Sequence, residues 1–195
     1  MWLSFHLKIM SKLHFRYASM NAGKSTQLLQ AAYNYTVDGH CIRCFTAAVD
    51  DRIKVGVIGS RLGINRDADI FTHETDFHDE LINETNLSCV FLDEAQFLTK
   101  RQASQLHRAV HEFNLPILCF GLRTDFRGEP FPGSSHLLAL ADDIQEVKSL
   151  CSCRRKATMN IRIDVAGNRV REGESILIGG NERYRQVCAK CFYAT

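Results

Sequence analysis

Ala18-Ser19-Met20-Asn21-Ala22-Gly23-Lys24-Ser25 lies between a short alternating run, 12–17, and a segment of helical periodicity that begins near Thr26. This pattern predicts a phosphate-binding loop. A turn of small residues before a helix directs backbone N–H groups and the positive end of the helix dipole at phosphate oxygens. Lys24 is then expected to reach the β- and γ-phosphates of ATP, and the Ser25 hydroxyl to ligate Mg²⁺.

Ala18 stands where the usual G-x-x-x-x-G-K-[ST] pattern has its first glycine. Glycine there usually supplies a positive φ, so either Ala18 takes an ordinary conformation or the turn is built differently. The alternative is a chance Gly-Lys-Ser at the start of a helix. The segments that follow argue against chance.

The composition fits one domain with a small appendage, since the chain has 195 residues. The formal net charge is only +2, so the overall balance gives no reason to expect a nucleic-acid or membrane partner. His6 and Lys8 interrupt the apolar N-terminus, which is too short to span a membrane and lacks a cleavage site. We expect a cytoplasmic protein whose residues 1–11 form a disordered extension, with Met10 as an alternative start.

Strand and helix patterns alternate along residues 12–150. Strands are expected at 12–17, 40–48, 87–92, 116–122 and 144–150, and helices at 25–35, 75–83, 99–114 and 135–141. Residues 54–70 are rich in glycine and are expected to form a loop. The alternation predicts an α/β fold: a RecA-like P-loop core with a parallel sheet over 12–150, followed by a small zinc-binding lobe over 151–195.

Two carboxylates, Asp93 and Glu94, follow the hydrophobic run at 87–92. A buried strand that ends in carboxylates downstream of a phosphate loop is typical of a Walker B motif. Asp93 would hold Mg²⁺ through water, and Glu94 would face the reacting hydroxyl; ordinary loop acids are the alternative. Asp50-Asp51-Arg52 likewise follows the expected strand at 40–48. This charged cluster is either part of a ligand site at the end of the strand or a solvated turn.

Two close cysteine pairs, Cys151 with Cys153 and Cys188 with Cys191, mark the C-terminal region. Four thiolates complete a tetrahedral Zn²⁺ site with no open position, so the pattern predicts structural zinc. A lobe of this size commonly needs such a staple. Disulfides and free buried thiols are the alternatives.

The other four cysteines are interpreted as packing residues. Cys41 and Cys44 lie on an expected strand, where residues three apart point to opposite faces and cannot share one ion. Cys89 and Cys119 belong to other hydrophobic runs.

Residues 161–164 and 176–178, between the cysteine pairs, are expected to form two strands of a hairpin or a long loop. Gly179 and Gly180 follow, with backbone groups that could bond a planar base; a plain hairpin turn is the alternative. Phe126, beyond the strand at 116–122, could stack on a base or pack in a turn.

Four motifs together are specific: Met20-Asn21-Ala22-Gly23-Lys24-Ser25, Asp93-Glu94-Ala95-Gln96-Phe97, Gly121-Leu122-Arg123-Thr124-Asp125-Phe126, and Ile178-Gly179-Gly180-Asn181-Glu182-Arg183-Tyr184 before Cys188. With them the chain resembles the cellular-type (type II) thymidine kinases from about residue 12 to residue 193. The resemblance implies transfer of the ATP γ-phosphate to the 5′-hydroxyl of thymidine, with deoxyuridine as a second substrate, for salvage DNA synthesis. It also implies a homotetramer inhibited by thymidine triphosphate.

The resemblance implies roles for individual residues as well. Glu94 matches the general base, Phe126 an aromatic beside the thymine, and the four paired cysteines the zinc ligands. The residues matched to the nucleotide and its Mg²⁺ are Ala18, Ser19, Met20, Asn21, Ala22, Gly23, Lys24, Ser25, Asp50, Asp51, Arg52, Asp93 and Gln96. Those matched to the loop that covers the nucleoside are Ser175, Ile176, Leu177, Ile178, Gly179 and Tyr184.

Two other functions stay open from the residues alone. One is a P-loop ATPase acting on nucleic acid, with 93–96 as a helicase-like acid box and the zinc module as a DNA-binding ribbon. The near-neutral charge and the lack of a second motor domain or a clustered basic face speak against it. The other is a nucleotide sensor without catalysis, which would give Glu94 no acceptor to activate.

Overall fold

The computed structural model describes residues 10–50, 54–177 and 182–194. Residues 1–9, which make up most of the expected N-terminal extension, lie outside this range, as do Asp51, Arg52, Ile178 and Gly179. The elements in chain order are β1 (Leu13–Ala18), α1 (Lys24–Val37), β2 (Cys41–Ala47), β3 (Val57–Gly59), β4 (Asn65–Asp67), β5 (Asp69–Phe71), α2 (Phe77–Leu81), β6 (Leu87–Leu92), the 3-10 helix η1 (Ala95–Phe97), α3 (Lys100–Phe113), β7 (Ile117–Leu122), α4 (Pro132–Leu140), β8 (Asp143–Glu146), β9 (Ser149–Leu150), β10 (Lys156–Ala157), β11 (Met159–Ile163), β12 (Arg169–Val170), β13 (Tyr184–Val187) and α5 (Ala189–Tyr193).

A six-stranded sheet in the order β5-β2-β6-β7-β1-β8 forms the centre of the fold. All of its strand pairs are parallel. The carboxyl ends of the strands therefore meet at one edge, which is where ligands bind in open α/β sheets. The expected α/β fold with a parallel sheet is confirmed.

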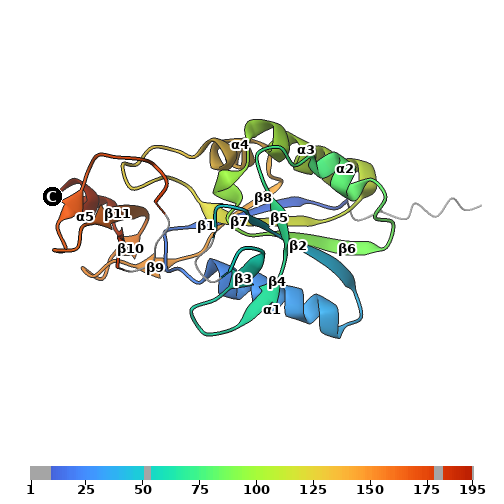
Figure 1. Ribbon diagram of the computed structural model, residues 1–195, viewed down its shortest axis with the longest axis horizontal. Helices are drawn as coiled ribbons and strands as arrows, with labels where there is room; N and C mark the ends of the chain where they lie inside the picture. Colours follow the sequence, from blue (N-terminus) through green and yellow to red (C-terminus); the bar gives the residue numbers. More distant parts are fainter. Residues whose placement is uncertain (1–9, 51–53, 178–181, 195) are drawn as a thin grey trace, which may run out of the picture.

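Helices cover both faces of this sheet (Figure 1). α1 lies on one face, and α2, α3 and α4 lie on the other. Because side chains alternate along a strand, Val90 and Leu92 of β6 pack in the core beneath α3, whereas Cys89 and Phe91 pack against α1. Such burial on both faces explains why the strands read as continuous hydrophobic runs.

Helix α3 begins and ends where its sequence indicates. Thr99 caps its N-terminus in a capping box with Gln102, in which each side chain accepts a hydrogen bond from the backbone N–H of the other residue. Asn114 ends the helix in the left-handed conformation, at φ 51°. The expected helix at 99–114 is thus confirmed to within one residue at each end.

The expected loop at 54–70 is wrong. β3 and β4 form an antiparallel hairpin, and β5 adds a strand to the edge of the main sheet beside β2. Each strand has only three residues, too short to show a period-two pattern among the glycines.

The expected strand at 144–150 is in fact two strands. β8 belongs to the main sheet, whereas β9 pairs with β10 in a separate hairpin. In helix α1, Leu28, Leu29 and Ala32 are buried in the core, whereas Tyr33 is exposed.

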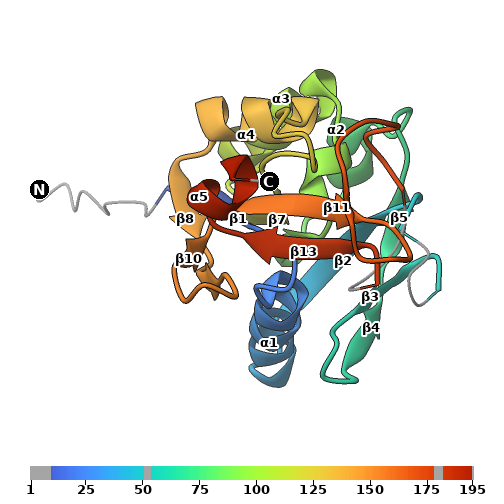
Figure 2. The same ribbon diagram turned by 90° about the vertical axis from the view of Figure 1, so that its left-hand side faces the viewer.

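The C-terminal lobe lies beyond the carboxyl edge of the main sheet (Figures 1 and 2). It contains the β9-β10 hairpin, a small antiparallel sheet in the order β12-β11-β13, and α5. The partner strands of β11 are thus β12 and β13. Ile176 and Leu177, expected in a hairpin strand or a long loop, have no regular structure, which agrees with the loop. Within the residues that the structure describes, no helix is long and apolar enough to cross a membrane.

Candidate active site and cysteine cluster

The loop between β1 and α1 has the geometry of a phosphate-binding turn. Ala18 is the last residue of β1, paired with Leu122 of β7, and has an ordinary strand conformation. The left-handed conformations fall instead at Asn21, with φ 63°, and at Gly23, with φ 81°. A glycine is therefore not required at residue 18, and α1 begins directly at Lys24.

The expected phosphate loop and the expected Walker B carboxylate are in contact. Ser25 Oγ donates a hydrogen bond of 2.7 Å to Asp93 Oδ2, which links the start of α1 to the end of β6. Lys24 is largely buried, and its ammonium donates to the carbonyl oxygen of Ser19 at 3.1 Å. A hydroxyl and a carboxylate side by side, with a cation nearby, suit a Mg²⁺–phosphate complex.

Glu94 is held in an unusual conformation next to Asp93. Its backbone is left-handed, with φ 54°, and its N–H donates to Asp93 Oδ1 at 3.0 Å. The Gln96 amide nitrogen donates to Glu94 Oε2, and the Gln96 amide oxygen accepts the Leu122 N–H at 2.9 Å. A non-glycine residue with such a backbone costs of order 1–3 kcal/mol and often marks a functional site.

Gly121 allows this close arrangement. A Cβ atom at residue 121 would lie 2.9 Å from the Gln96 amide oxygen, a distance that side-chain carbons do not tolerate. Gln96, matched to the nucleotide from sequence, thus lies against Glu94 and β7.

Two cavities adjoin at this edge of the sheet. A groove of about 510 Å³ runs along residues 20–27 and 59–62, and a smaller pocket of about 70 Å³ lies on the other side of Glu94. Glu94 lines both cavities, as do Met20 and Leu122. The other residues of the pocket are Asp50, Gln96, Phe97, Thr124, Asp125, Phe126, Phe131, Asn160, Ser175, Ile176, Leu177 and Tyr184.

The outer wall of the pocket belongs to the C-terminal lobe. The Arg162 guanidinium is buried and lies 3.9 Å from the ring centre of Phe126. It donates hydrogen bonds of 2.8 and 3.1 Å to the Tyr184 hydroxyl, which in turn donates to the Leu177 carbonyl at 2.8 Å. Ser175 Oγ donates to Asp125 Oδ2 at 3.0 Å. Arg162 and Ser175 therefore join the lobe to the loop after β7.

Asp125 is charged at neutral pH in this setting. Burial opposes its ionisation, but hydrogen bonds from the Arg127 side chain and backbone, from Ser175 and from the Glu129 N–H outweigh that effect. Together they hold the pKa of Asp125 below its usual value. The contact with Ser175 is thus charge-assisted over the whole physiological pH range.

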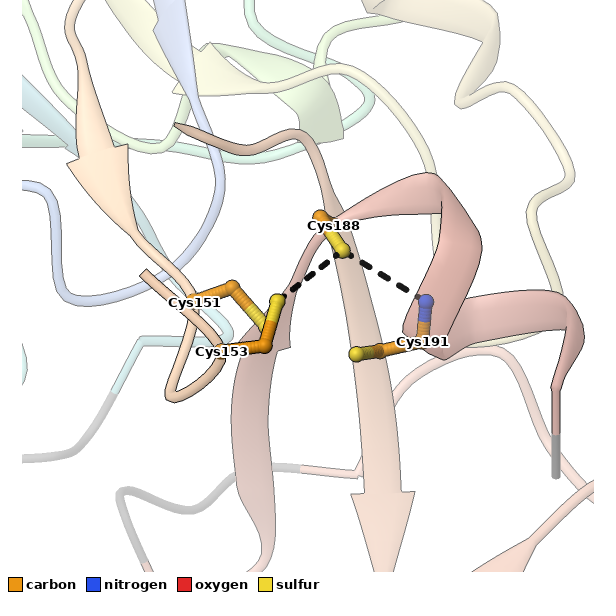
Figure 3. Close-up of side chains that lie close together, drawn as sticks. All are labelled: Cys151, Cys153, Cys188 and Cys191. Atoms are coloured by element: carbon orange, nitrogen blue, oxygen red, sulfur yellow. Dashed lines mark hydrogen bonds between the residues drawn. The ribbon is translucent and has the colours of Figure 1, made fainter. Parts of the chain in front are cut away.

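The four C-terminal cysteines form one cluster (Figure 3). Their sulfurs all lie within 4.8 Å of one another, and the sulfurs of Cys153 and Cys188 are 3.5 Å apart. Zn–S bonds of about 2.3 Å in a tetrahedron place sulfurs about 3.8 Å apart, so the cluster fits zinc. Cys151 and Cys153 come from the turn between β9 and β10, and Cys188 and Cys191 from the start of α5.

The acid–base properties of the cluster also suit a cation. Burial opposes ionisation of Cys151, but backbone N–H groups prevail and lower the pKa of this thiol to about 6. The neighbouring sulfurs of Cys153, Cys188 and Cys151 raise the pKa of Cys191 to about 12. Cys151 therefore loses its proton readily, whereas Cys191 does not. A bound metal ion would stabilise the thiolate form of Cys191 as well.

Three of the four remaining cysteines pack in the core, as expected. Cys44, Cys89 and Cys119 are buried, and burial raises the pKa of Cys44 to about 11 and that of Cys89 to about 12. Cys41 differs: it is exposed at the start of β2, so its interpretation as a packing residue is wrong.

Sequence reasoning missed the residues by which the lobe contacts the phosphate loop. Asn160 Oδ1 accepts the Met20 N–H at 2.7 Å, and the Asn21 amide donates to Gln186 Oε1 at 2.8 Å. No motif points to Asn160 or Arg162, since each acts through partners far away in the chain. Phe97 carried a signal, because it is the last residue of the motif Asp93-Glu94-Ala95-Gln96-Phe97.

Comparisons with known proteins agree with this geometry. A family model described as "Thymidine kinase" matches residues 11–192. A protein of Chromobacterium violaceum with the same description is 55% identical over 184 residues, which cover 94% of this chain and 99% of that protein. Thymidine kinases of Albidiferax ferrireducens and Coxiella burnetii are 54% and 50% identical, each over 94% of this chain and over 93% and 95% of their own lengths.

Proposed function

The chain belongs to the thymidine kinase family, and we propose that its groove binds the triphosphate of ATP while its pocket binds the nucleoside. The activity is that of a phosphotransferase acting on thymidine, as in the relatives. The reaction moves the γ-phosphoryl group of ATP to the 5′-hydroxyl of thymidine. Deoxyuridine, which differs only by the thymine methyl group, is proposed as a second substrate.

Glu94 carries the proposal, because it lines both the groove and the pocket. A carboxylate at this junction is within reach of a hydroxyl that enters from the pocket toward a phosphate in the groove. Glu94 accepts the proton of the 5′-hydroxyl as the oxygen attacks the γ-phosphorus in line with the leaving ADP oxygen. Gln96, which donates a hydrogen bond to one Glu94 oxygen, orients the carboxylate.

The phosphate side depends on the loop at 18–25. Its backbone N–H groups, the N-terminus of α1 and Lys24 bind the phosphate oxygens and stabilise the charge that develops on them. Ser25 and Asp93 would hold Mg²⁺, whose charge would further neutralise the phosphates. Asp51 and Arg52, proposed to contact the triphosphate, lie outside the described residues, and Asp50 lines the pocket beside Glu94.

The nucleoside side is closed by the C-terminal lobe. Phe126 offers an aromatic face for the base, and the backbone of 175–177 with Tyr184 covers the pocket. Ile178 and Gly179, proposed to complete this cover, lie outside the described residues. A closed pocket excludes water, which would otherwise compete with the nucleoside for the phosphoryl group.

The four-cysteine cluster is proposed as a structural zinc site, since four thiolates leave no coordination position for a substrate. We also propose a homotetramer, a division into a nucleotide-binding domain at 12–150 and a lid domain at 151–195, and a cytoplasmic location. A reducing compartment keeps such thiolates available for the metal.

Product analysis tests the reaction. Purified protein with Mg²⁺ and ATP is given thymidine, deoxyuridine, deoxycytidine, single-stranded DNA or no acceptor, and ADP and nucleoside monophosphate are measured together. ADP that depends on thymidine, with an equal amount of thymidine monophosphate, supports the proposal. ATP hydrolysis that is stimulated by DNA and yields no monophosphate would replace it with the nucleic-acid ATPase.

The variant Glu94→Gln tests the assigned role. Loss of a general base lowers kcat by about 10²–10⁴-fold, whereas nucleotide binding to the groove should change little. An unchanged kcat would remove Glu94 from the role of base.

A further inference from the structure

We propose a second metal site, formed by His107, His111 and Asp142, that binds zinc or a similar divalent transition-metal ion. The two histidines are four residues apart on α3, so their imidazoles lie on the same face of the helix. Asp142 directly precedes β8 and faces them. One ligand atom from each of the three residues lies within 4.8 Å of the other two.

The distances are close to those of a tetrahedral site. Zn–N bonds of about 2.0–2.1 Å at a tetrahedral angle separate two nitrogens by about 3.3–3.4 Å. The Nε2 atoms of His107 and His111 are 3.3 Å apart. Asp142 Oδ2 lies 3.8 Å from His111 Nε2. Small rotations of partly exposed side chains would bring the carboxylate to bonding distance.

Asp142 is positioned for such a role by the neighbouring strand. Its Oδ2 accepts the Leu13 N–H at 2.8 Å, and its own N–H donates to the Leu13 carbonyl at 2.9 Å. A hydrogen bond to a ligating carboxylate is the usual outer-shell support of a metal site, and the oxygen keeps a second lone pair for the ion. Arg108, which lies between the two histidines in sequence, donates a hydrogen bond of 2.7 Å to Glu112. This ion pair neutralises the positive charge of Arg108 near the site.

The site differs from the cysteine cluster in chemistry and in place. Two imidazoles and one carboxylate select zinc, cobalt, nickel or copper, and leave at least one coordination position for water. β1, β8 and the end of α3 meet here at the amino edge of the sheet, opposite the phosphate loop (Figure 1). A bound ion would therefore join α3 to β1 and β8 without touching either substrate cavity.

The alternative is a hydrogen bond between the two imidazoles, with Asp142 as an ordinary surface partner of His111. That arrangement needs one ring N–H directed at the lone pair of the other ring, and it binds no metal. Metal binding distinguishes the two.

The test is calorimetric titration of Zn²⁺ into full-length protein that already holds one zinc in the cysteine cluster, verified by elemental analysis. We expect one further equivalent to bind. His107→Ala and His111→Ala should each weaken this binding at least tenfold, and Asp142→Asn about tenfold. His73→Ala, an exposed histidine outside the cluster, is the matched control and should leave the second equivalent unchanged.

A second measurement avoids the variants. In the unmodified protein, imidazole ¹⁵N spectra recorded during the titration should shift for His107 and His111 first among the eight histidines. Two results of the calorimetric titration would overturn the proposal. One is that no second equivalent of Zn²⁺ binds, and the other is that the second equivalent still binds to the double variant His107→Ala/His111→Ala. Thymidine turnover should be the same in the double variant, which separates this site from the proposed active site.

Discussion

Replacing Arg162 with methionine should weaken thymidine binding far more than ATP binding. Methionine keeps much of the length and packing volume of the arginine stem but has neither the charge nor the hydrogen-bond donors. The guanidinium lies 3.9 Å from the ring centre of Phe126 and donates twice to the Tyr184 hydroxyl. The substitution removes all of these contacts together. They join the outer wall of the pocket, which belongs to the C-terminal lobe, to Phe126 in the loop after β7.

The magnitude follows from the contacts that are lost. A desolvated cation–π contact contributes up to about 2 kcal/mol, and a hydrogen bond from a charged donor about 1.5–3 kcal/mol. Arg162 is 5% exposed, so solvent screens these contacts little. One such contact and two such hydrogen bonds amount to about 5–8 kcal/mol. Most of this loss falls on the free protein, and we assign about 2.7 kcal/mol, roughly half of the lower figure, to the ordering of the wall around the nucleoside. That corresponds to a roughly 100-fold rise in the dissociation constant of thymidine.

Two further variants sharpen the assay. Arg162→Lys keeps a positive charge over Phe126 but loses the planar fork, so an intermediate loss of about tenfold is expected. Arg162→Met combined with Tyr184→Phe should show coupling of about 1–2 kcal/mol, because both variants break the same hydrogen bonds. Arg171→Met, at an exposed arginine of the same lobe, is the matched control.

Thymidine and ATP affinities are measured separately by calorimetry. An unchanged thymidine affinity in Arg162→Met would refute the reasoning. Equal losses for both ligands would also contradict it, since they would indicate damage to the lobe as a whole.

Three other predictions concern the metals and pH. Ser25→Ala should raise the Mg²⁺ concentration required for half-maximal ATP turnover about tenfold, since it removes the hydroxyl bonded to Asp93; a magnesium titration checks this. Cys153→Ser should abolish zinc binding and destabilise the lobe, because structural zinc contributes on the order of 10–16 kcal/mol; stoichiometric zinc with normal turnover would contradict the site. Asp125 has a lowered pKa when folded, so its stabilisation is complete above the unfolded pKa of about 3.9 and is lost as pH falls through the folded value. Unfolding free energies of the wild type and Asp125→Asn should therefore converge in acid.

Much of the core could be predicted from sequence because its signals are local. The run at 87–92 became β6 without a shift, and Thr99 and Asn114 mark the ends of α3 by their own side-chain and backbone preferences. Strands buried on both faces leave continuous apolar runs, and their carboxyl ends share one edge. The joint position of Ser25, Asp93 and Glu94 follows from these two facts.

The parts that failed lack such local signals. β3, β4 and β5 have three residues each, and their stability comes from pairing with segments already in place. For residues 176–177 the sequence could not decide between a strand and a long loop, because these hydrophobic residues face the pocket and not a partner strand. Arg162 looks like any alternating residue of a strand, since its partners Phe126 and Tyr184 lie 36 and 22 positions away.

These distant contacts also bear on what zinc would do in the four-cysteine cluster. Asn160 and Gln186, on adjacent strands of the lobe, hydrogen-bond the phosphate loop at Met20 and Asn21, while Arg162 supports the pocket. The same small sheet, β11 with β13, thus contacts the proposed sites of both substrates. Cys188 directly follows β13, so a metal bound there fixes the end of this sheet. Loss of zinc should therefore disturb the phosphate loop together with the nucleoside pocket, which a lid acting on thymidine alone would not do.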